Sequence, residues 1–370
     1  MDTQGSPLKS GERLMSVDAL RGFDMFLIIG GGRTIRDFIK AADINLLNKL
    51  LPQLDHVPWE GFSFWDIIMP LFLFIVGVAM PFSFIKRLAL GDSKAKLYRH
   101  IIIRSVILFI LGMAAQGHLL EYDLSKLHIY CNTLQAIAAG YLVASFILLN
   151  LRLIWQIIAT AVLLLLFWAL MALVPVPGYG RGILTPEGNL AIYIDRLILG
   201  RFEDGTSYTW ILSSMTFACT VMLGVFAGYI LRSQKNKAAK TVLLFALSFG
   251  LILLGILWHI FFPIIKHLWT SSFVLFSAGL SYFLLAAFYL VIDVLKFRRW
   301  SFGFVVIGTN AIFAYMSNAL IDFRDIGHSF IGGLSRFIGQ WDVFARSFGG
   351  FAIIWLVLYW MYSKKTFIKI

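Results

Sequence analysis

The sequence Asp55-His-Val-Pro-Trp-Glu-Gly-Phe-Ser-Phe-Trp-Asp66 runs directly into the apolar segment 67–85. A histidine, two aspartates and a glutamate therefore stand at the mouth of a segment long enough to cross a membrane as a helix. Ionisable groups in that position are costly to desolvate, so they are rare unless they are used or paired. We interpret this stretch as the element around which the rest of the chain is organised.

A second unusual stretch, residues 16–33, places charged residues inside another apolar span. Asp18 and Arg21 are three residues apart, so they share one helix face and partly neutralise each other. This spacing is compatible with a structural ion pair and equally with a polar wall for an anionic ligand, in which Arg21 binds phosphate. The run Gly30-Gly-Gly-Arg33 either lets a ligand or another backbone approach closely or simply ends the helix.

The composition is that of an integral membrane protein. Hydrophobic residues make up 59% of the 370 residues and charged residues 14%, whereas soluble domains usually carry about 25% charged residues. The mean hydropathy is +0.81. Alternating strands of about ten residues are absent, so the apolar runs predict an all-α, polytopic membrane protein rather than a barrel. We expect about ten transmembrane helices, near residues 17–33, 64–85, 101–117, 129–149, 153–174, 209–231, 241–262, 272–293, 301–320 and 347–363.

The positions of the charges predict the orientation of these helices. With a cytoplasmic N-terminus, the inner loops hold 18 basic residues and three acids, and the outer loops hold 11 basic residues and 13 acids. The positive-inside rule therefore predicts that both termini are cytoplasmic and that His56 lies outside. The formal net charge of +12 then reflects topology and anionic lipid rather than nucleic acid. The inner loops are residues 1–16, 86–100, 150–152, 232–240, 294–300 and 364–370.

The chain reads as one membrane domain, residues 17–363, between cytoplasmic tails at 1–16 and 364–370. The longest outer connection, residues 175–208, is rich in Pro and Gly, which indicates an ordered loop rather than a second domain. Two cysteines and seven scattered histidines show no metal-ligand spacing, so we expect no metal site.

Single polar residues have both structural and chemical interpretations. His56 titrates in a range suited to proton transfer, and Asp55 and Asp66 are near enough in sequence to fix its tautomer, but most solitary histidines are solvated or structural. Asp66 is equally a cap acid of the following helix. Amides inside spans, such as Gln135 and Asn310, most often bond across helix interfaces. Trp269 opens a span, where a tryptophan of the interfacial belt is the plainer explanation.

The chain resembles the transmembrane acyltransferase family of heparan-alpha-glucosaminide N-acetyltransferases and their bacterial relatives. The resemblance extends over almost the whole chain from residue 13 onward, with Ile28 where the lysosomal enzyme has an asparagine. The chain begins without that enzyme's large luminal region, which fits a bacterial inner membrane. The motifs that carry the resemblance are Arg13-Leu-Met-Ser-Val-Asp-Ala-Leu-Arg-Gly22, Gly30-Gly-Gly-Arg33 and His56-x-x-Trp59-x-Gly61-(four residues)-Asp66-(three residues)-Pro70-x-Phe72-x-Phe74-Ile-x-Gly77.

The resemblance implies transfer of an acetyl group from cytosolic acetyl-CoA to the amine of a terminal glucosamine on the opposite side of the membrane. It implies a catalytic His56, which we pair with Asp66. His56 either takes a proton from the attacking amine, which asks less of one histidine, or is itself acetylated. We expect acetyl-CoA to bind at the basic inner side and the amino sugar near His56. The candidate donor residues are Asp18, Arg21, Lys86, Arg87, Arg104, Gln135 and Asn310, and the candidate acceptor residues are Asp55, Trp59, Glu60 and Trp269.

Two other classes of function stay open from the sequence alone. A proton-coupled transporter of a sugar or lipid-linked solute would use Asp18, Arg21 and Asp66 as its proton relay. A non-catalytic membrane scaffold would need none of these groups. A homodimer is compatible with each class, and each has the lipid bilayer as a partner.

Overall fold

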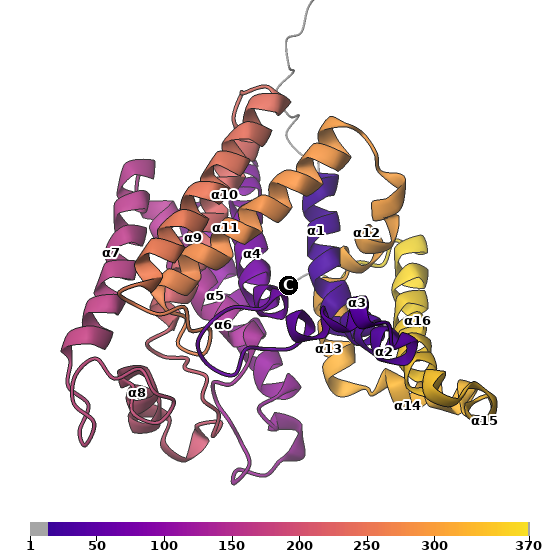
Figure 1. Ribbon diagram of the computed structural model, residues 1–370. Helices are drawn as coiled ribbons and strands as arrows, with labels where there is room; N and C mark the ends of the chain where they lie inside the picture. The colour runs from indigo at the N-terminus through magenta and orange to yellow at the C-terminus, as the bar shows by residue number, and fades with distance from the viewer. Residues whose placement is uncertain (1–13, 369–370) are drawn as a thin grey trace, which may run out of the picture.

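Helices account for nearly all of the regular structure (Figure 1). The computed structural model describes residues 14–368. Within these residues the β-structure consists of two isolated bridges. The all-α prediction is therefore confirmed. The long helices are α4 (Ile68–Ala89), α5 (Lys94–Ala115), α6 (Thr133–Asn150), α7 (Leu153–Leu173), α9 (Ser214–Arg232), α10 (Lys237–His259), α11 (Ser271–Phe288) and α16 (Asp342–Ser363). The shorter helices are α1 (Met15–Phe26), α2 (Gly32–Ala42), α3 (Asn45–Asn48), α8 (Leu190–Leu199), α12 (Phe302–Gly308), α13 (Ala311–Leu320), α14 (Phe323–Ile331) and α15 (Ser335–Ile338).

Eight helices within the described residues are long and apolar enough to cross a membrane. The segments 299–308 and 311–320 would form a ninth span if they are counted together. They are separated by a short break, at which the chain bends by 66°. These spans correspond to nine of the predicted segments. The prediction of about ten is not confirmed, because the first predicted span, 17–33, is not one continuous helix.

The interruption of that first span follows from its glycines. α1 ends at Phe26, and a π-helical turn, Leu27–Gly31, joins it to α2. Within this turn Gly30 has φ +118°, a conformation that residues with a side chain rarely adopt. The glycine run therefore kinks the chain into α2 instead of continuing the span.

Two groups of helices make up the bundle (Figure 1). α4 packs on α9, α5 and α9 pack on α6, and α10 packs on α11, while on the other side α1 packs on α12 and α14 on α16. At the α4–α9 crossing, a Cβ on Gly77 would overlap the Val221 carbonyl oxygen, and one on Gly224 would overlap the Phe74 carbonyl oxygen. Small residues at such crossings let membrane helices approach closely, because lipid supplies no hydrophobic drive for association.

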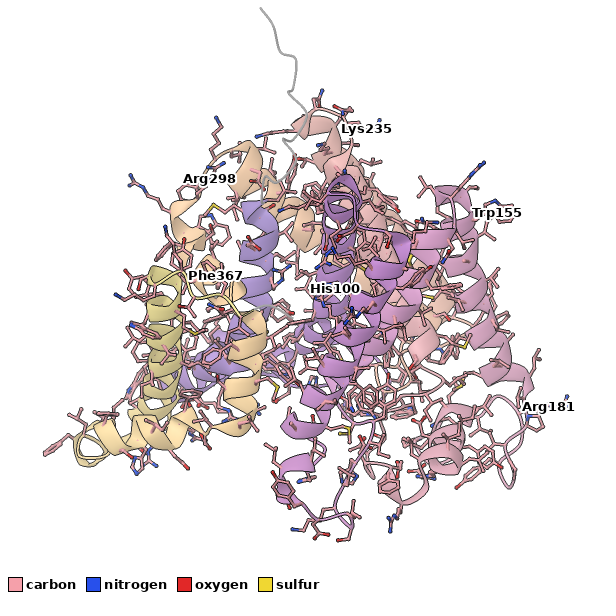
Figure 2. The ribbon with its side chains drawn as sticks, turned by 180° about the vertical axis from the view of Figure 1, so that it is seen from behind. His100, Trp155, Arg181, Lys235, Arg298 and Phe367 are labelled. Carbon is pink, nitrogen blue, oxygen red and sulfur yellow. The ribbon has the colours of Figure 1, made fainter. Side chains whose placement is uncertain are left out.

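The two ends of the bundle carry different loops. Figure 2 places Lys235 and Arg298 at one end and Arg181 at the opposite end, as the charge pattern predicts for the loops that hold them. We call the first the basic end. α4 runs from the segment that carries His56 to Lys86 and Arg87 in its last turn, and we call the end that holds His56 the histidine end.

The α4–α9 crossing yields a stability prediction. Gly224→Ala should destabilise the fold by about 1–3 kcal/mol, because the new methyl group must displace the α4 backbone. The control is Gly250→Ala on α10, where a Cβ meets no atom within 4 Å and alanine is the better helix former. Thermal unfolding of the detergent-purified variants measures both. Equal midpoints for the two variants would contradict the close crossing.

Candidate functional site

Asp66 is fixed by the turn that precedes α4. Residues Phe64–Ile67 form a 3₁₀ turn whose cap is Ser63. The Ser63 backbone N–H and the Ser63 hydroxyl each donate to Asp66 Oδ2 at 3.0 Å. The sequence prediction that Asp66 is a cap acid is therefore confirmed. The capping bonds occupy one carboxylate oxygen and leave the other for partners outside the turn.

His56 forms a hydrogen bond with that second oxygen. Its Nδ1 lies 2.7 Å from Asp66 Oδ1, and the backbone N–H of Val57 donates to Asp66 Oδ2 at 3.4 Å. The His56 side chain is 45% exposed, whereas that of Asp66 is 1% exposed. Within the described chain Nε2 makes no hydrogen bond, so it is the ring nitrogen available to a ligand. A ring oriented by a buried carboxylate through one nitrogen is the arrangement of a general base or nucleophile.

Lys266 completes this cluster and was missed from the sequence. Its Nζ lies 3.0 Å from His56 Nδ1 and 3.2 Å from Asp66 Oδ1, and its side chain is 8% exposed. It comes from the loop between α10 and α11, some 200 residues along the chain. The one available signal was a lone lysine between two apolar spans. We call His56, Asp66 and Lys266 the imidazole cluster.

Backbone pairing holds that loop against the segment that carries His56. The Gly61 N–H donates to the Ile264 carbonyl oxygen at 2.9 Å, and Glu60 and Ile265 form an antiparallel bridge. The position of Lys266 therefore follows from main-chain contacts rather than from its own flexible side chain. Burial lowers the pKa of Lys266 below its ordinary value, and the neighbouring Asp66 carboxylate acts against this shift.

Aromatic rings lie beside the imidazole cluster. Tyr208 stacks on His267 with 4.1 Å between ring centroids, and Trp59 meets His267 edge-on at 5.3 Å. Lys266 Nζ lies 5.9 Å from the centroid of the Tyr208 ring. Burial, and then the charge of Lys266, lower the pKa of His267 to about 4. His267 is therefore neutral near pH 7, and its Nδ1 shares a hydrogen bond with the Ser207 hydroxyl, 2.6 Å away.

We call Trp59, Tyr208 and His267 the aromatic wall. Of the predicted acceptor residues, Trp59 belongs to it, and its Nε1 donates to the Leu184 carbonyl oxygen at 2.9 Å. Asp55 forms an ion pair with Arg36 of α2 at 2.7 Å, and Glu60 lies 3.9 Å from His259.

Trp269 occupies a different environment from the one its sequence position suggested. It is 1% exposed, and its Nε1 donates to the Thr220 hydroxyl at 2.9 Å. The interfacial-belt interpretation of Trp269 is wrong, because its hydrogen-bond partner lies in the bundle core. Its role as an acceptor residue stays a prediction that this burial disfavours.

The predicted donor residues lie in several environments. Asp18 and Arg21 form the expected ion pair at 3.3 Å. Lys86 is exposed, and Arg87 lies 3.9 Å from Asp92. Asp66 and Arg87 stand at opposite ends of α4, so about 30 Å of helix separates the imidazole cluster from the basic end.

Three further donor candidates already have contact partners within the protein. The guanidinium of Arg104 lies 4.7 Å from the centroid of the Tyr141 ring. Gln135 is buried and accepts from the Cys131 N–H at 2.9 Å, so it braces the start of α6 instead of bonding across helices. Asn310 stands at the break between α12 and α13, where it donates to the Thr366 carbonyl oxygen at 3.0 Å and accepts from the Ile368 N–H at 2.9 Å.

A cavity of about 520 Å³ lies next to the redirected first span. The π-helical turn, α13, α14 and α16 contribute to it, together with the residue that precedes Asp66. We call it the glycine-turn cavity. Its lining includes Ile28, Gly30, Arg33, Trp65, Asn318 and Arg324.

Two curated proteins are similar to the chain over nearly its whole length. Heparan-alpha-glucosaminide N-acetyltransferase of Mus musculus is 26% identical over an alignment of 434 positions, which covers 98% of this chain and 61% of that protein. The chain is a distant relative of this acetyltransferase. The Homo sapiens acetyltransferase is likewise 26% identical, over 97% of this chain and 60% of its own length. The chain thus spans about three fifths of the length of its acetyltransferase relatives. No family model matches it.

The depressed pKa of His267 predicts a dependence of stability on pH. The unfolded chain takes up this proton near pH 6.5 and the folded chain near pH 4. Because the unfolded state binds the proton more readily, the contribution of neutral His267 is fully present above pH 6.5 and is lost as the pH falls toward 4.

Melting temperatures of the wild type and of His267→Gln, measured from pH 7.5 to 4, test this dependence. We expect the wild type to lose stability relative to the variant between pH 6.5 and 4. Curves that stay parallel over this range would show that His267 is not desolvated in the folded protein.

Proposed function

We propose that the chain is a transmembrane acyltransferase that moves an acetyl group from acetyl-CoA to the amine of a glucosamine-type sugar at the histidine end. The observation that carries the proposal is the imidazole cluster, in which His56 is half exposed and held by Asp66 at 2.7 Å. The relationship to N-acetyltransferases over nearly the whole chain supports the same reaction class. We place the protein in a bacterial inner membrane, with the basic end toward the cytosol.

His56 serves as the general base in this reaction. Nε2 takes a proton from the acceptor amine as its nitrogen attacks the thioester carbonyl carbon. The C–N bond forms, the C–S bond breaks, and the proton passes from His56 to the departing CoA thiolate. Asp66 stabilises the transient imidazolium through Nδ1–H. In the stepwise form of the reaction, Nε2 itself carries the acetyl group between donor and acceptor.

The donor and the acceptor approach the cluster from opposite ends. CoA carries several negative charges, so its phosphates belong at the basic end, where Arg21, Lys86 and Arg87 are the candidates. Its acyl arm must then extend along α4 toward His56. The glycine-turn cavity is a candidate for the last part of this route, because Trp65, one of its lining residues, precedes Asp66 in the same 3₁₀ turn.

The aromatic wall is the proposed acceptor site. Trp59 and Tyr208 both contact His267, and sugar rings commonly pack on aromatic faces because their C–H groups are apolar. Asp55 is paired with Arg36, so Glu60 is the candidate carboxylate for an ammonium-bearing sugar. A homodimer stays a prediction.

One observation favours the transporter alternative. Asp24 of α1 is fully buried, and neither of its carboxyl oxygens has a hydrogen-bond partner in the described chain. A buried carboxyl group within an apolar bundle is a typical element of a proton pathway. That alternative would use Asp66 as well, but it does not require the half-exposed imidazole of His56, so we favour the enzyme.

The catalytic role of His56 is tested by substitution. His56→Ala should lower acetyl transfer about 100-fold or more, because a general base contributes a factor of that size, and should leave acetyl-CoA binding intact. The matched control is His118→Ala, since His118 is also a half-exposed histidine paired with a carboxylate.

The assay uses proteoliposomes with radiolabelled acetyl-CoA and a panel of amino sugars. Transfer by His56→Ala at the wild-type rate would remove His56 from the mechanism.

The enzyme and transporter alternatives differ in their response to acetyl-CoA. A ligand that binds the folded state alone, at 100 times its Kd, stabilises a protein by about 2.7 kcal/mol. We therefore expect acetyl-CoA to raise the melting temperature, and desulfo-CoA to do the same if the phosphates dominate binding. Proton-coupled sugar uptake by CoA-free proteoliposomes, with no thermal response to acetyl-CoA, would favour the transporter.

A further inference from the structure

The Nδ1 atom of His56 has two polar neighbours that make opposite demands on it. Asp66 Oδ1, at 2.7 Å, is an acceptor and requires a proton on Nδ1. An ammonium group on Lys266, at 3.0 Å, is a donor and requires a lone pair there. A neutral imidazole carries its one proton on either Nδ1 or Nε2, so it satisfies one neighbour at a time.

The protonation state of Lys266 decides which neighbour is satisfied. When Lys266 is an ammonium, it donates to His56 Nδ1 and to Asp66 Oδ1, and the proton of the neutral ring lies on Nε2. That tautomer presents N–H, not a lone pair, to the exposed side. When Lys266 is a neutral amine, Nδ1–H donates to Asp66 and the lone pair lies on Nε2.

We propose that Lys266 is the positioning residue that selects the reactive tautomer of His56, so that Nε2 becomes a base or nucleophile when Lys266 loses its proton. The inference rests on the proposed function, since the reaction requires a lone pair on Nε2 in both its direct and its stepwise forms. The proton that Lys266 loses goes to solvent, through the exposed half of the cluster.

The surroundings of Lys266 make this proton loss accessible. Its side chain is 8% exposed, and burial disfavours the charged form and lowers its pKa. The groups that face it are Asp66 from the 3₁₀ turn, His56 from the preceding segment and the Tyr208 ring from the loop before α9. His267, its neighbour in the loop, is uncharged near pH 7. Asp66 is therefore the anion that opposes proton loss.

The tautomer itself is the first readout, and it needs no substrate. ¹⁵N-histidine-labelled protein in nanodiscs is examined by NMR over pH, and the His56 signals are identified by their loss in His56→Gln. In the wild type we expect the neutral ring to change from Nε2–H to Nδ1–H as the pH rises. A single tautomer throughout, in the wild type, would overturn the proposal whatever the variants do.

Two substitutions of Lys266 mimic its uncharged and its charged state. Lys266→Met has no proton to lose, so its neutral His56 ring should be Nδ1–H at every pH. Lys266→Arg is permanently cationic, so its ring should stay Nε2–H. Lys126→Met, an exposed lysine at the same end that pairs with Glu121, is the control and should behave as wild type.

The rate profile is the second readout. We expect Lys266→Arg to lower kcat about 100-fold with little change in KM, and Lys266→Met to lose the rise of kcat with pH that the wild type shows. Transfer activity with the same profile in Lys266→Met and wild type would overturn the inference and leave the proposed function standing. A pH-driven tautomer change without acetyl transfer to any amino sugar would support the assignment of Lys266 and count against the proposed reaction.

Discussion

The charge of one buried carboxylate constrains the whole histidine end of the molecule. A desolvated carboxylate is tolerated when several donors surround it, and loss of one partner leaves an uncompensated charge. Asp66 meets this requirement with donors from three parts of the chain: its own turn through Ser63, the preceding segment through His56 and Val57, and the distant loop through Lys266. The same contacts that solvate the charge therefore assemble the cluster.

The α4–α9 crossing gives that cluster a rigid base. Gly77 and Gly224 bring the two backbones together along the helix that begins just after Asp66. Because α9 and α4 are locked in register there, the 3₁₀ turn at the start of α4 has a defined position relative to the loops that lie over it. A site supported by packed helices in this way holds its geometry better than one built from loops alone.

Local sequence patterns predicted the features that depend on neighbours in the chain. The pairing of His56 with Asp66, the capping role of Asp66 and the pair of Asp18 with Arg21 all follow from short-range geometry. Lys266 and the Tyr208–His267 stack could not be predicted in this way, since each requires knowledge of which loops meet at the end of the bundle. Hydropathy also failed to reveal the break in the first span, because a helix and a glycine turn of the same apolar residues have the same average.

The ion pair between Arg36 and Asp55 has a consequence for how a ligand is received. It ties the residue before His56 to α2, while the Gly61 and Ser63 backbone N–H groups tie the residues after it to the Ile264 carbonyl oxygen and the Asp66 carboxylate. The peptide on both sides of the ring is thus anchored before any ligand arrives. Such preorganisation moves the loss of conformational freedom from association to folding, so that an incoming molecule is bound without first having to immobilise a floppy segment.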